Sequence, residues 1–179
     1  MKNVALIIID IQKVYFCEGK YFLPNSEAAA KNAGKILSSW RSAGNTVIHV
    51  KHHFQLNEEL KHLNDIHEAV LPKDNEVIVE KRYPNSFLKT DLLEVLNAGK
   101  ISEVVIVGMM SNMCIDTTVR ACQNYGIKTT LIHDACAAKS IDFGNEEISA
   151  DIVHKVFMGA MDGMFAKVID TETLLNSCE

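Results

Sequence analysis

The stretch of sequence that most constrains the fold covers residues 104–120. Residues 104–107 are Val-Val-Ile-Val, and Gly108 follows them. A run of apolar β-branched residues that ends at a glycine is typical of a strand buried on both faces, as in a parallel sheet. Beyond it, apolar positions recur at helical spacing. The stretch therefore predicts a buried strand that leads directly into a helix.

This helix is expected to start close to Cys114, with Asn112 as a suitable N-cap. The positions that recur on one helical face are Ile115, Val119 and Cys122. In the first turn of a helix, unpaired backbone N–H groups favour negative charge, so a thiol there is easier to ionise and more nucleophilic. Cys114 is therefore a candidate nucleophile. A small buried hydrophobe is the usual role of a free cysteine, and position alone leaves both interpretations open.

The length and composition of the chain fit one domain, which we expect to span residues 1–179. The hydrophobic content of 47% is enough for a sizeable core. The formal net charge is −5 and no basic run occurs, which argues against nucleic acid or an anionic membrane as the main partner. A small-molecule substrate stays open as a partner.

The apolar run near the N-terminus and the spacing of the cysteines predict where the protein is located and whether its thiols are reduced. Residues 4–9 form the only apolar run near the N-terminus, and they are too short for a signal peptide or a membrane span, so we expect a cytoplasmic protein. The cysteines are odd in number and include no C-x-x-C pair, which argues against a disulfide framework or a zinc ribbon. We expect reduced thiols at Cys17, Cys114, Cys122, Cys136 and Cys178.

Further apolar runs alternate with helical patterns along the whole chain. The other expected strands are residues 4–9, 46–50, 76–80, 127–132 and 165–169. The other expected helices are residues 26–44, 88–99 and 146–161 and one at the C-terminus. Strands that alternate with helices build parallel sheets through right-handed crossovers. We therefore predict an α/β fold, a three-layer α/β/α arrangement with a six-stranded parallel sheet of the Rossmann-like, doubly wound kind.

Two charged residues come directly after predicted strands. Asp10 follows the first strand, and Lys81 follows the third. Ligands of open α/β sheets bind at the carboxyl ends of the strands, so both are site candidates. A turn aspartate and a solvated lysine are the ordinary alternatives. Asp134, after the fifth strand, is interpreted as structural.

Residues 51–75 show no strand pattern, but their apolar positions fit one short amphipathic helix that would cover the site as a lid. Five of the seven histidines fall in or beside this segment: His49, His52, His53, His62 and His67. Imidazoles at this density raise the question of a zinc site. No recognised ligand spacing is present, however, and surface or core histidines explain the cluster equally well.

Three short motifs, each at the end of a predicted strand, resemble those of the isochorismatase-like cysteine hydrolases, a family that includes nicotinamidases and other amide hydrolases. Residues 10–15 resemble the opening D-x-Q-x-x-F, with Tyr15 in the place of phenylalanine. Lys81, followed by Ser86-Phe87 and Thr90, resembles the lysine motif. Residues 108–114 resemble the G-x-x-[ST]-[DN]-x-C motif of the nucleophile. The resemblance spans nearly the whole chain.

The resemblance implies a role for each matching residue. Cys114 would be the nucleophile, Asp10 the general acid and base, and Lys81 the partner of both. A cis peptide would lie between Met109 and Met110, and the backbone amides of Met110 and Cys114 would form an oxyanion hole. Tyr15 and Phe87 are the aromatic residues whose motif positions imply contact with the substrate. Members of the family are usually oligomers, which implies a homo-oligomer, a dimer or a tetramer.

The resemblance also bears on metal binding. Metal-dependent nicotinamidases carry an aspartate two residues before a histidine. At that offset this chain has Val50 before His52 and Lys51 before His53. We therefore expect no metal and no other cofactor.

These features together predict a cysteine hydrolase that cleaves a small amide through a thioester intermediate with an Asp-Lys-Cys triad. One alternative is an isochorismatase-type hydrolase of a non-amide substrate, in which Asp10 acts as the acid and Cys114 is incidental. Another is a non-catalytic thiol protein or ligand-binding module that has kept the fold.

Overall fold

The computed structural model describes residues 3–16 and 21–177, so Cys17 and Cys178 lie outside the described residues. Within these ranges the main sheet has six strands, all parallel, in the order β3-β2-β1-β4-β5-β8. The strands are β1 (Val4–Ile9), β2 (Thr46–His52), β3 (Val77–Lys81), β4 (Glu103–Met109), β5 (Lys128–Ala137) and β8 (Lys167–Ile169). The predicted fold class is confirmed.

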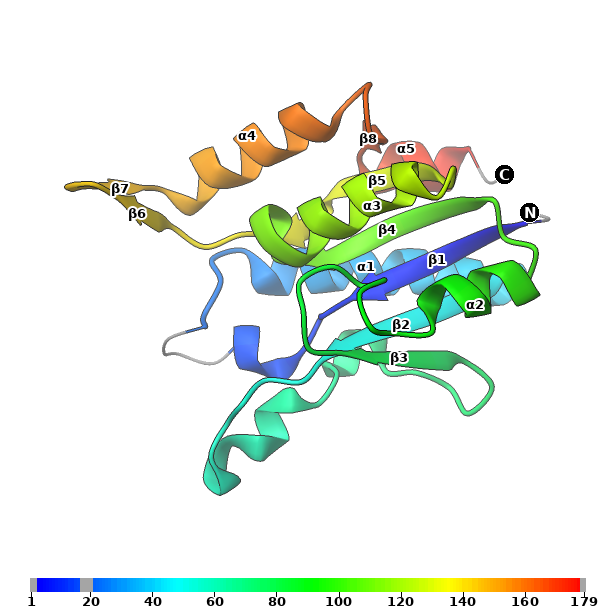
Figure 1. Ribbon diagram of the computed structural model, residues 1–179, viewed down its shortest axis with the longest axis horizontal. Coiled ribbons are helices and arrows are strands. Elements are labelled where there is room, and N and C mark those ends of the chain that lie inside the picture. Colours follow the sequence, from blue (N-terminus) through cyan, green and yellow to red (C-terminus); the bar gives the residue numbers. More distant parts are fainter. Residues whose placement is uncertain (1–2, 17–20, 178–179) are drawn as a thin grey trace.

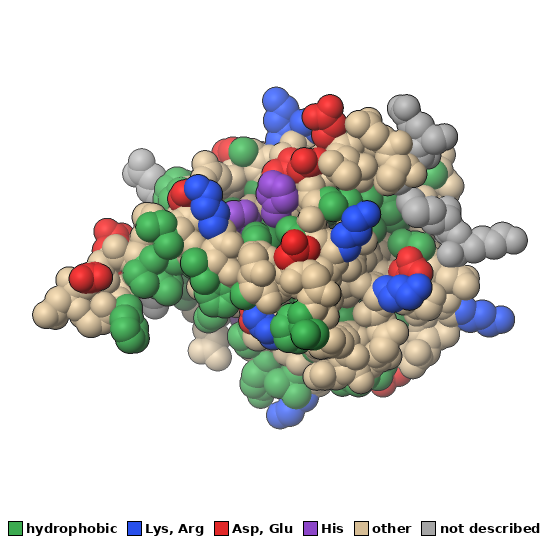
Figure 2. Space-filling view, turned by 90° about the horizontal axis from the view of Figure 1, so that it is seen from above, with side chains coloured by type: hydrophobic (Ala, Val, Ile, Leu, Met, Phe, Trp, Pro, Cys, Tyr) green, Lys and Arg blue, Asp and Glu red, His purple; other side chains and the backbone are tan. Residues whose placement is uncertain are grey.

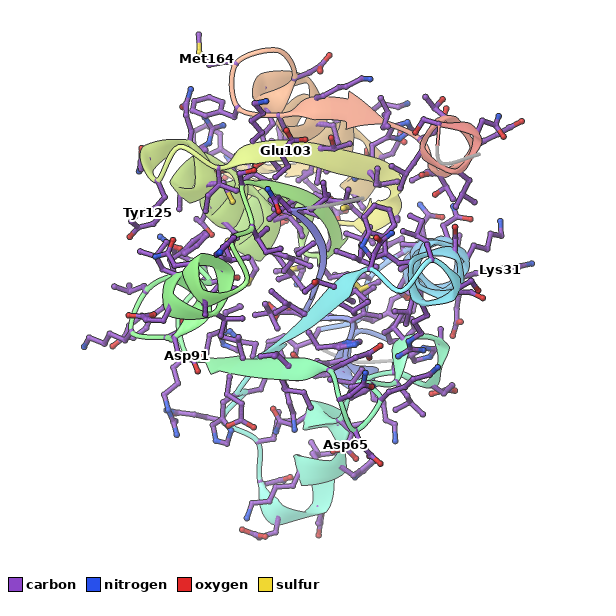
Figure 3. The ribbon with its side chains drawn as sticks, turned by 90° about the vertical axis from the view of Figure 1, so that its right-hand side faces the viewer. Lys31, Asp65, Asp91, Glu103, Tyr125 and Met164 are labelled. Atoms are coloured by element: carbon purple, nitrogen blue, oxygen red, sulfur yellow. The ribbon has the colours of Figure 1, made fainter. Side chains whose placement is uncertain are left out.

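Helices cover both faces of the sheet (Figure 1). One face carries α1 (Ser26–Ser42) and α5 (Thr171–Asn176). The other carries α2 (Leu92–Ala98), α3 (Asp116–Asn124) and α4 (Ala150–Met161). Figure 3 shows the layers from the side, with Lys31 on one side of the sheet and Asp91 and Tyr125 on the opposite side. No helix of the described residues is long and apolar enough to cross a membrane.

Strand β1 lies in the interior of the sheet, between β2 and β4. Ala5, Ile7 and Ile9 belong to the core under α2, α3 and α4. Leu6 and Ile8 belong to the core under α1. Both faces of the strand are covered, which is why its sequence is continuously apolar instead of alternating. The residue that follows β1 therefore emerges at the middle of the carboxyl edge of the sheet.

Gly108 in β4 permits a close approach to β1. It pairs with Ile9, and its φ is +135°. A Cβ at this position would overlap the carbonyl oxygen of Ile9. Only glycine accepts both this φ and this contact. The two strands are thus drawn together directly before Asp10 and before the loop that carries Cys114.

The predicted helix over 146–161 is wrong in its first turn. Glu146–Ile148 forms strand β7, which pairs antiparallel with β6 (Ile141–Phe143), and the helix starts at Ala150. The side chain of Ser149 accepts a hydrogen bond from the Ile152 N–H, so this serine is the N-cap. Because the apolar periodicity continues across Ser149, it does not indicate that the helix begins only at Ala150.

The segment 51–75 also differs from the prediction. It contains two 3₁₀ helices, η2 (Glu58–Asn64) and η3 (Glu68–Val70), in place of one amphipathic α-helix. The side chains of Asn57 and His67 accept from the backbone N–H groups of Leu60 and Ala69 and so cap both short turns. Such local side-chain bonds compete with a continuous helix.

Asp134 is structural, as expected. Its Oδ1 accepts from the backbone N–H and the hydroxyl of Thr171, at 2.8 Å each. Its Oδ2 accepts from Asn32 Nδ2 at 3.0 Å. The aspartate thereby links α1, β5 and the start of α5. It lies on β5, because that strand continues to Ala137 instead of ending at residue 132.

Candidate active site

The carboxyl edge of the sheet brings Asp10, Lys81 and Cys114 into contact. Asp10 follows β1, Lys81 is the last residue of β3, and Cys114 lies in the loop after β4. The Lys81 ammonium donates to Asp10 Oδ2 at 2.6 Å and to Cys114 Sγ at 3.1 Å. Asp10 is 0% and Lys81 2% exposed, so the ion pair is desolvated. Lys81 thereby contacts Asp10, 71 positions away in the sequence, and Cys114, 33 positions away.

The backbone around Cys114 differs in part from the expectation. Cys114 lies in a π-helical turn, η4 (Ser111–Ile115), and α3 begins only after it. Asn112 is inside this turn, and the N-cap position is held by Met110. The peptide between Met109 and Met110 is cis, as the resemblance implied. Single π turns inside helices are frequent at functional sites.

The expectation that the Cys114 thiol ionises easily is wrong. Burial raises the pKa of Cys114, and the negative charge of Asp10 raises it further. Lys81 lowers the pKa of the thiol, but the two opposing effects outweigh it. The resting thiol is therefore neutral, and it would have to lose its proton before it could act as a nucleophile.

The Asp10 carboxylate lies beside this thiol. Burial raises the pKa of Asp10, although the nearby Lys81 charge acts against this effect. Its Oδ1 is buried and has no hydrogen-bond partner among the described residues. The sulfur of Cys114 lies within 4.8 Å of the carboxylate. A basic carboxylate with one open oxygen beside a neutral thiol is an arrangement for general base catalysis.

His52 is a member of the site that the sequence patterns did not reveal in this role. Its Nδ1 lies 3.1 Å from Lys81 Nζ. An ammonium has three N–H donors, and here Asp10, Cys114 and His52 accept them. Burial, together with the charges of Lys81 and His53, lowers the pKa of His52 to about 4, so the ring is neutral at pH 7. The sequence feature that could have indicated this role is the position of His52 at the end of β2, at the same carboxyl edge of the sheet as Asp10 and Lys81.

Gln12, the glutamine of the D-x-Q motif, holds the backbone of His52. Its Oε1 accepts from the His52 N–H at 2.7 Å, and its Nε2 donates to the His52 carbonyl at 2.9 Å. The same Nε2 donates to the carbonyl of Asn64 at 2.7 Å. Gln12 is 0% exposed. Gln12 therefore joins the end of β2 and the segment 51–75 to the residues that follow Asp10.

The site also contains a set of side chains of the metal-binding type. The donor atoms of Asp10, His52 and Cys114 lie within 4.8 Å of one another. The Lys81 ammonium is in hydrogen-bond contact with each of them. The centre of this set is thus taken by an organic cation, which fits poorly with a metal ion at the same place.

The aromatic residues singled out in the motifs lie in different surroundings. Tyr15 is 2% exposed, and burial together with the charges of Asp10 and Cys114 holds its pKa well above the ordinary range. Its ring meets that of Phe54 edge to face at 5.6 Å. Phe54 also lies against the His52 ring at 4.6 Å. These aromatic rings form an apolar wall beside the reactive groups.

Phe87 lies on the α3 side. It is 8% exposed, belongs to the same core cluster as Cys114, and contacts the ring of Tyr125 at 4.9 Å. The preceding Ser86 is joined to α3 because its N–H and hydroxyl bond to Thr118 Oγ1 at 3.1 and 2.8 Å. The lysine motif is therefore attached to the helix that follows the nucleophile loop.

Comparisons with known proteins identify the family and support the fold. The Isochorismatase domain family matches residues 4–173. The isochorismatase family protein YddQ of Bacillus subtilis is 42% identical over 178 residues, 97% of this chain and 99% of that protein. The crystal structure of a putative isochorismatase hydrolase from Oleispira antarctica has a TM-score of 0.93 at 35% identity, over 98% of this chain and 97% of that one.

A more distant relative has a named activity. Maleamate amidohydrolase of Pseudomonas putida is 24% identical over 160 residues, which cover 79% of this chain and 75% of that protein. The family match covers residues 4–173, and the alignment with YddQ covers 97% of this chain. This chain belongs to the isochorismatase family and is a hydrolase.

Proposed function

We propose that the protein hydrolyses a small amide, with Cys114 as nucleophile, Asp10 as general base and acid, and Lys81 as their electrostatic partner. The observation that carries the proposal is the desolvated contact of one ammonium with both the carboxylate and the sulfur, at 2.6 and 3.1 Å. The activity named for the P. putida relative, an amidohydrolase, supports the same class of substrate.

In the first half of the reaction, Sγ attacks the carbonyl carbon while Asp10 takes the thiol proton. The resulting oxyanion is bound by the backbone N–H groups of Met110 and Cys114. Asp10 then returns the proton to the leaving nitrogen, the C–N bond breaks, and a thioester on Cys114 remains. Lys81 compensates the negative charge while it moves between sulfur and carboxylate.

In the second half, a water molecule attacks the thioester carbon and gives a proton to Asp10. The tetrahedral intermediate collapses, the C–S bond breaks, and the sulfur recovers the proton from Asp10. The carboxylic acid leaves and the resting state is restored. The proton balance closes within the chain, so this mechanism uses neither metal nor cofactor.

The aromatic wall supports a proposal on the substrate. Tyr15 and Phe54 present apolar rings beside the buried polar groups. Such a site favours a compact amide whose acyl group has an apolar or flat surface. We place Tyr15 in contact with the acyl group and Phe87 at the opposite wall.

We further propose that the single domain assembles as a homo-oligomer in the cytoplasm. The β6–β7 hairpin extends from the body of the protein (Figure 1), and Figure 2 shows hydrophobic side chains at that end of the molecule. Phe143 is 79% and Val156 60% exposed. Apolar side chains this exposed on adjacent elements are typical of surfaces that become covered.

A screen of small primary amides for ammonia release, with added Zn²⁺ in one series and a chelator in the other, tests the function. We expect at least one amide to be cleaved at equal rates in both series. Cleavage that requires zinc would contradict the cofactor-free mechanism. Failure of every amide, together with turnover of a vinyl ether such as isochorismate, would favour the non-amide alternative, and no turnover at all would favour a binding module.

A further inference from the structure

The Lys81 ammonium makes a third contact that the amidase mechanism does not use. We propose that His52 is a positioning residue, whose Nδ1 fixes the Lys81 ammonium between Asp10 and Cys114, and that Gln12 holds His52 for this task. The inference rests on the proposed function, since it assigns a task within that mechanism.

The geometry of the ammonium carries the inference. Three acceptors surround Nζ: Asp10 Oδ2 at 2.6 Å, His52 Nδ1 at 3.1 Å and Cys114 Sγ at 3.1 Å. A tetrahedral ammonium with all three N–H groups bonded has one orientation, whereas with two bonded it keeps freedom to rotate and shift. Asp10 and Cys114 change charge during the reaction, so neither is a constant anchor. Among the partners of the ammonium in the described residues, His52 is the one whose charge the proposed reaction does not change.

The backbone of His52 is held as firmly as its ring. The Gln12 amide bonds both the N–H and the C=O of His52, at 2.7 and 2.9 Å. Gln12 lies two residues after Asp10, so the base and the anchor of the ammonium are set by one short segment. The histidine ring also packs on Phe54, which limits its rotation.

Three variants isolate the acceptor at Nδ1. His52→Leu removes it, and His52→Asn puts an amide oxygen close to the position of Nδ1. His53→Leu is the matched control, because His53 is the exposed neighbour in sequence and bonds Lys81 through its backbone N–H alone. If His52→Leu does not fold by circular dichroism and thermal unfolding, His52→Gln replaces it, since its oxygen lies one bond farther along the side chain.

The first measurement is steady-state hydrolysis of the best amide from the screen. We expect His52→Leu to lower kcat about 10- to 100-fold, the loss associated with one hydrogen bond to a charged group, with KM nearly unchanged. His52→Asn should recover most of kcat, and His53→Leu should equal the wild type. Equal kcat for His52→Leu and His53→Leu, or no recovery in His52→Asn, would overturn the inference.

The second measurement does not depend on turnover. Iodoacetamide alkylation of Cys114 is followed by mass spectrometry of the tryptic peptide 101–120, in which Cys114 is the sole cysteine. Lys81 stabilises the thiolate, so a displaced ammonium slows alkylation in His52→Leu but not in His52→Asn or His53→Leu. A rate in His52→Leu equal to or above that of the control would overturn the inference. If the wild type cleaves no amide, the proposed function fails, and this comparison alone decides the role of His52.

Discussion

A cluster of charged side chains lies near each end of strands β2 and β3, partly buried at one end and buried at the other, and the two clusters are built from similar residues in different ways. At the amino end of β3, Glu76 lies with Arg41 and His49. At the carboxyl ends, Lys81 lies with Asp10, His52 and Cys114. Each cluster contains an acid, a base and a histidine of β2, and the two histidines are three residues apart.

The Glu76 cluster leaves no carboxylate oxygen unused. Arg41 binds Glu76 through two nitrogens at 2.7 Å each, His49 Nε2 lies at 2.9 Å, and the Lys73 N–H donates at 2.9 Å. Burial by itself raises the pKa of Glu76, but the hydrogen bonds from Arg41, the Lys73 amide and His49 prevail and lower it to about 2. This carboxylate is held in its charged form.

The Asp10 carboxylate differs from that of Glu76, because only one of its two oxygens has a hydrogen-bond partner among the described residues. Asp10 Oδ1 has no partner among the described residues, the pKa of Asp10 is raised, and a thiol lies beside it. A carboxylate whose two oxygens are both hydrogen-bonded stabilises a fold, whereas one with an unbonded oxygen beside a thiol has capacity left for a substrate and a proton. The comparison therefore separates the two clusters by the saturation of the carboxylate alone, since His49 Nδ1 in the Glu76 cluster is also buried without a partner among the described residues.

The largest expected effect comes from Asp10→Asn. Loss of the general base should lower kcat for amide hydrolysis about 10²- to 10⁴-fold. The same change removes the negative charge that raises the pKa of the thiol, so iodoacetamide should alkylate Cys114 faster than in the wild type. Both rates are measured on one preparation. A variant that hydrolyses amides normally, or whose thiol becomes less reactive, would contradict the assignment of Asp10.

Glu76→Gln should act on stability and not on turnover. It weakens a charge-assisted pair with Arg41, so we expect the free energy of unfolding at pH 7 to fall by about 2 kcal/mol. Urea denaturation measures this change, and kcat should stay at the wild-type value. A loss of kcat without a loss of stability would show that the two clusters are not separable.

The stabilisation by Glu76 should depend on pH. The pKa of Glu76 is about 2 in the folded protein, against 4.5 for a glutamate in the unfolded chain. As the pH falls, the unfolded chain therefore binds a proton at Glu76 before the folded protein does. The contribution of Glu76 is therefore complete above pH 5 and is lost as the pH falls toward 2. Urea denaturation of the wild type and Glu76→Gln at pH 7, 4 and 3 should show a difference that shrinks steadily. A constant difference would mean that the carboxylate charge contributes nothing.

The smallest effect is expected at an exposed pair. Lys128 and Glu103 lie 3.1 Å apart, with side chains 80% and 46% exposed. Glu103→Gln should change the free energy of unfolding by less than about 0.5 kcal/mol, because water and salt screen such pairs. The same urea assay measures this change in the free energy of unfolding. An effect as large as that of Glu76→Gln would show that burial does not explain the larger contribution expected of Glu76.

The sequence was informative where one pattern had one structural meaning. Continuous apolar runs predicted the buried strands, and the carboxyl-edge rule predicted that Asp10 and Lys81 would meet. The β6–β7 hairpin escaped prediction because the apolar spacing of α4 extends backward across Ser149 into Ile148. The boundary depends on a cap that the spacing does not reveal.

Features of the site that depend on distances in three dimensions were beyond sequence reasoning. His52 contacts Lys81 because β2 and β3 pair with these two residues in register. The raised pKa of Cys114 follows from its burial and from Asp10, 104 positions away in the sequence. Gln12 was visible as a motif residue, but its bonds to the backbone of His52 were not.

The rate of ammonia release by Cys114→Ala, relative to the wild type on the same amide, tests the central claim most directly. With the unfolding curve unchanged, removal of the attacking sulfur should lower this rate at least about 10⁴-fold, as expected when a covalent nucleophile is lost. A folded Cys114→Ala that retains more than a tenth of the wild-type rate would contradict the account.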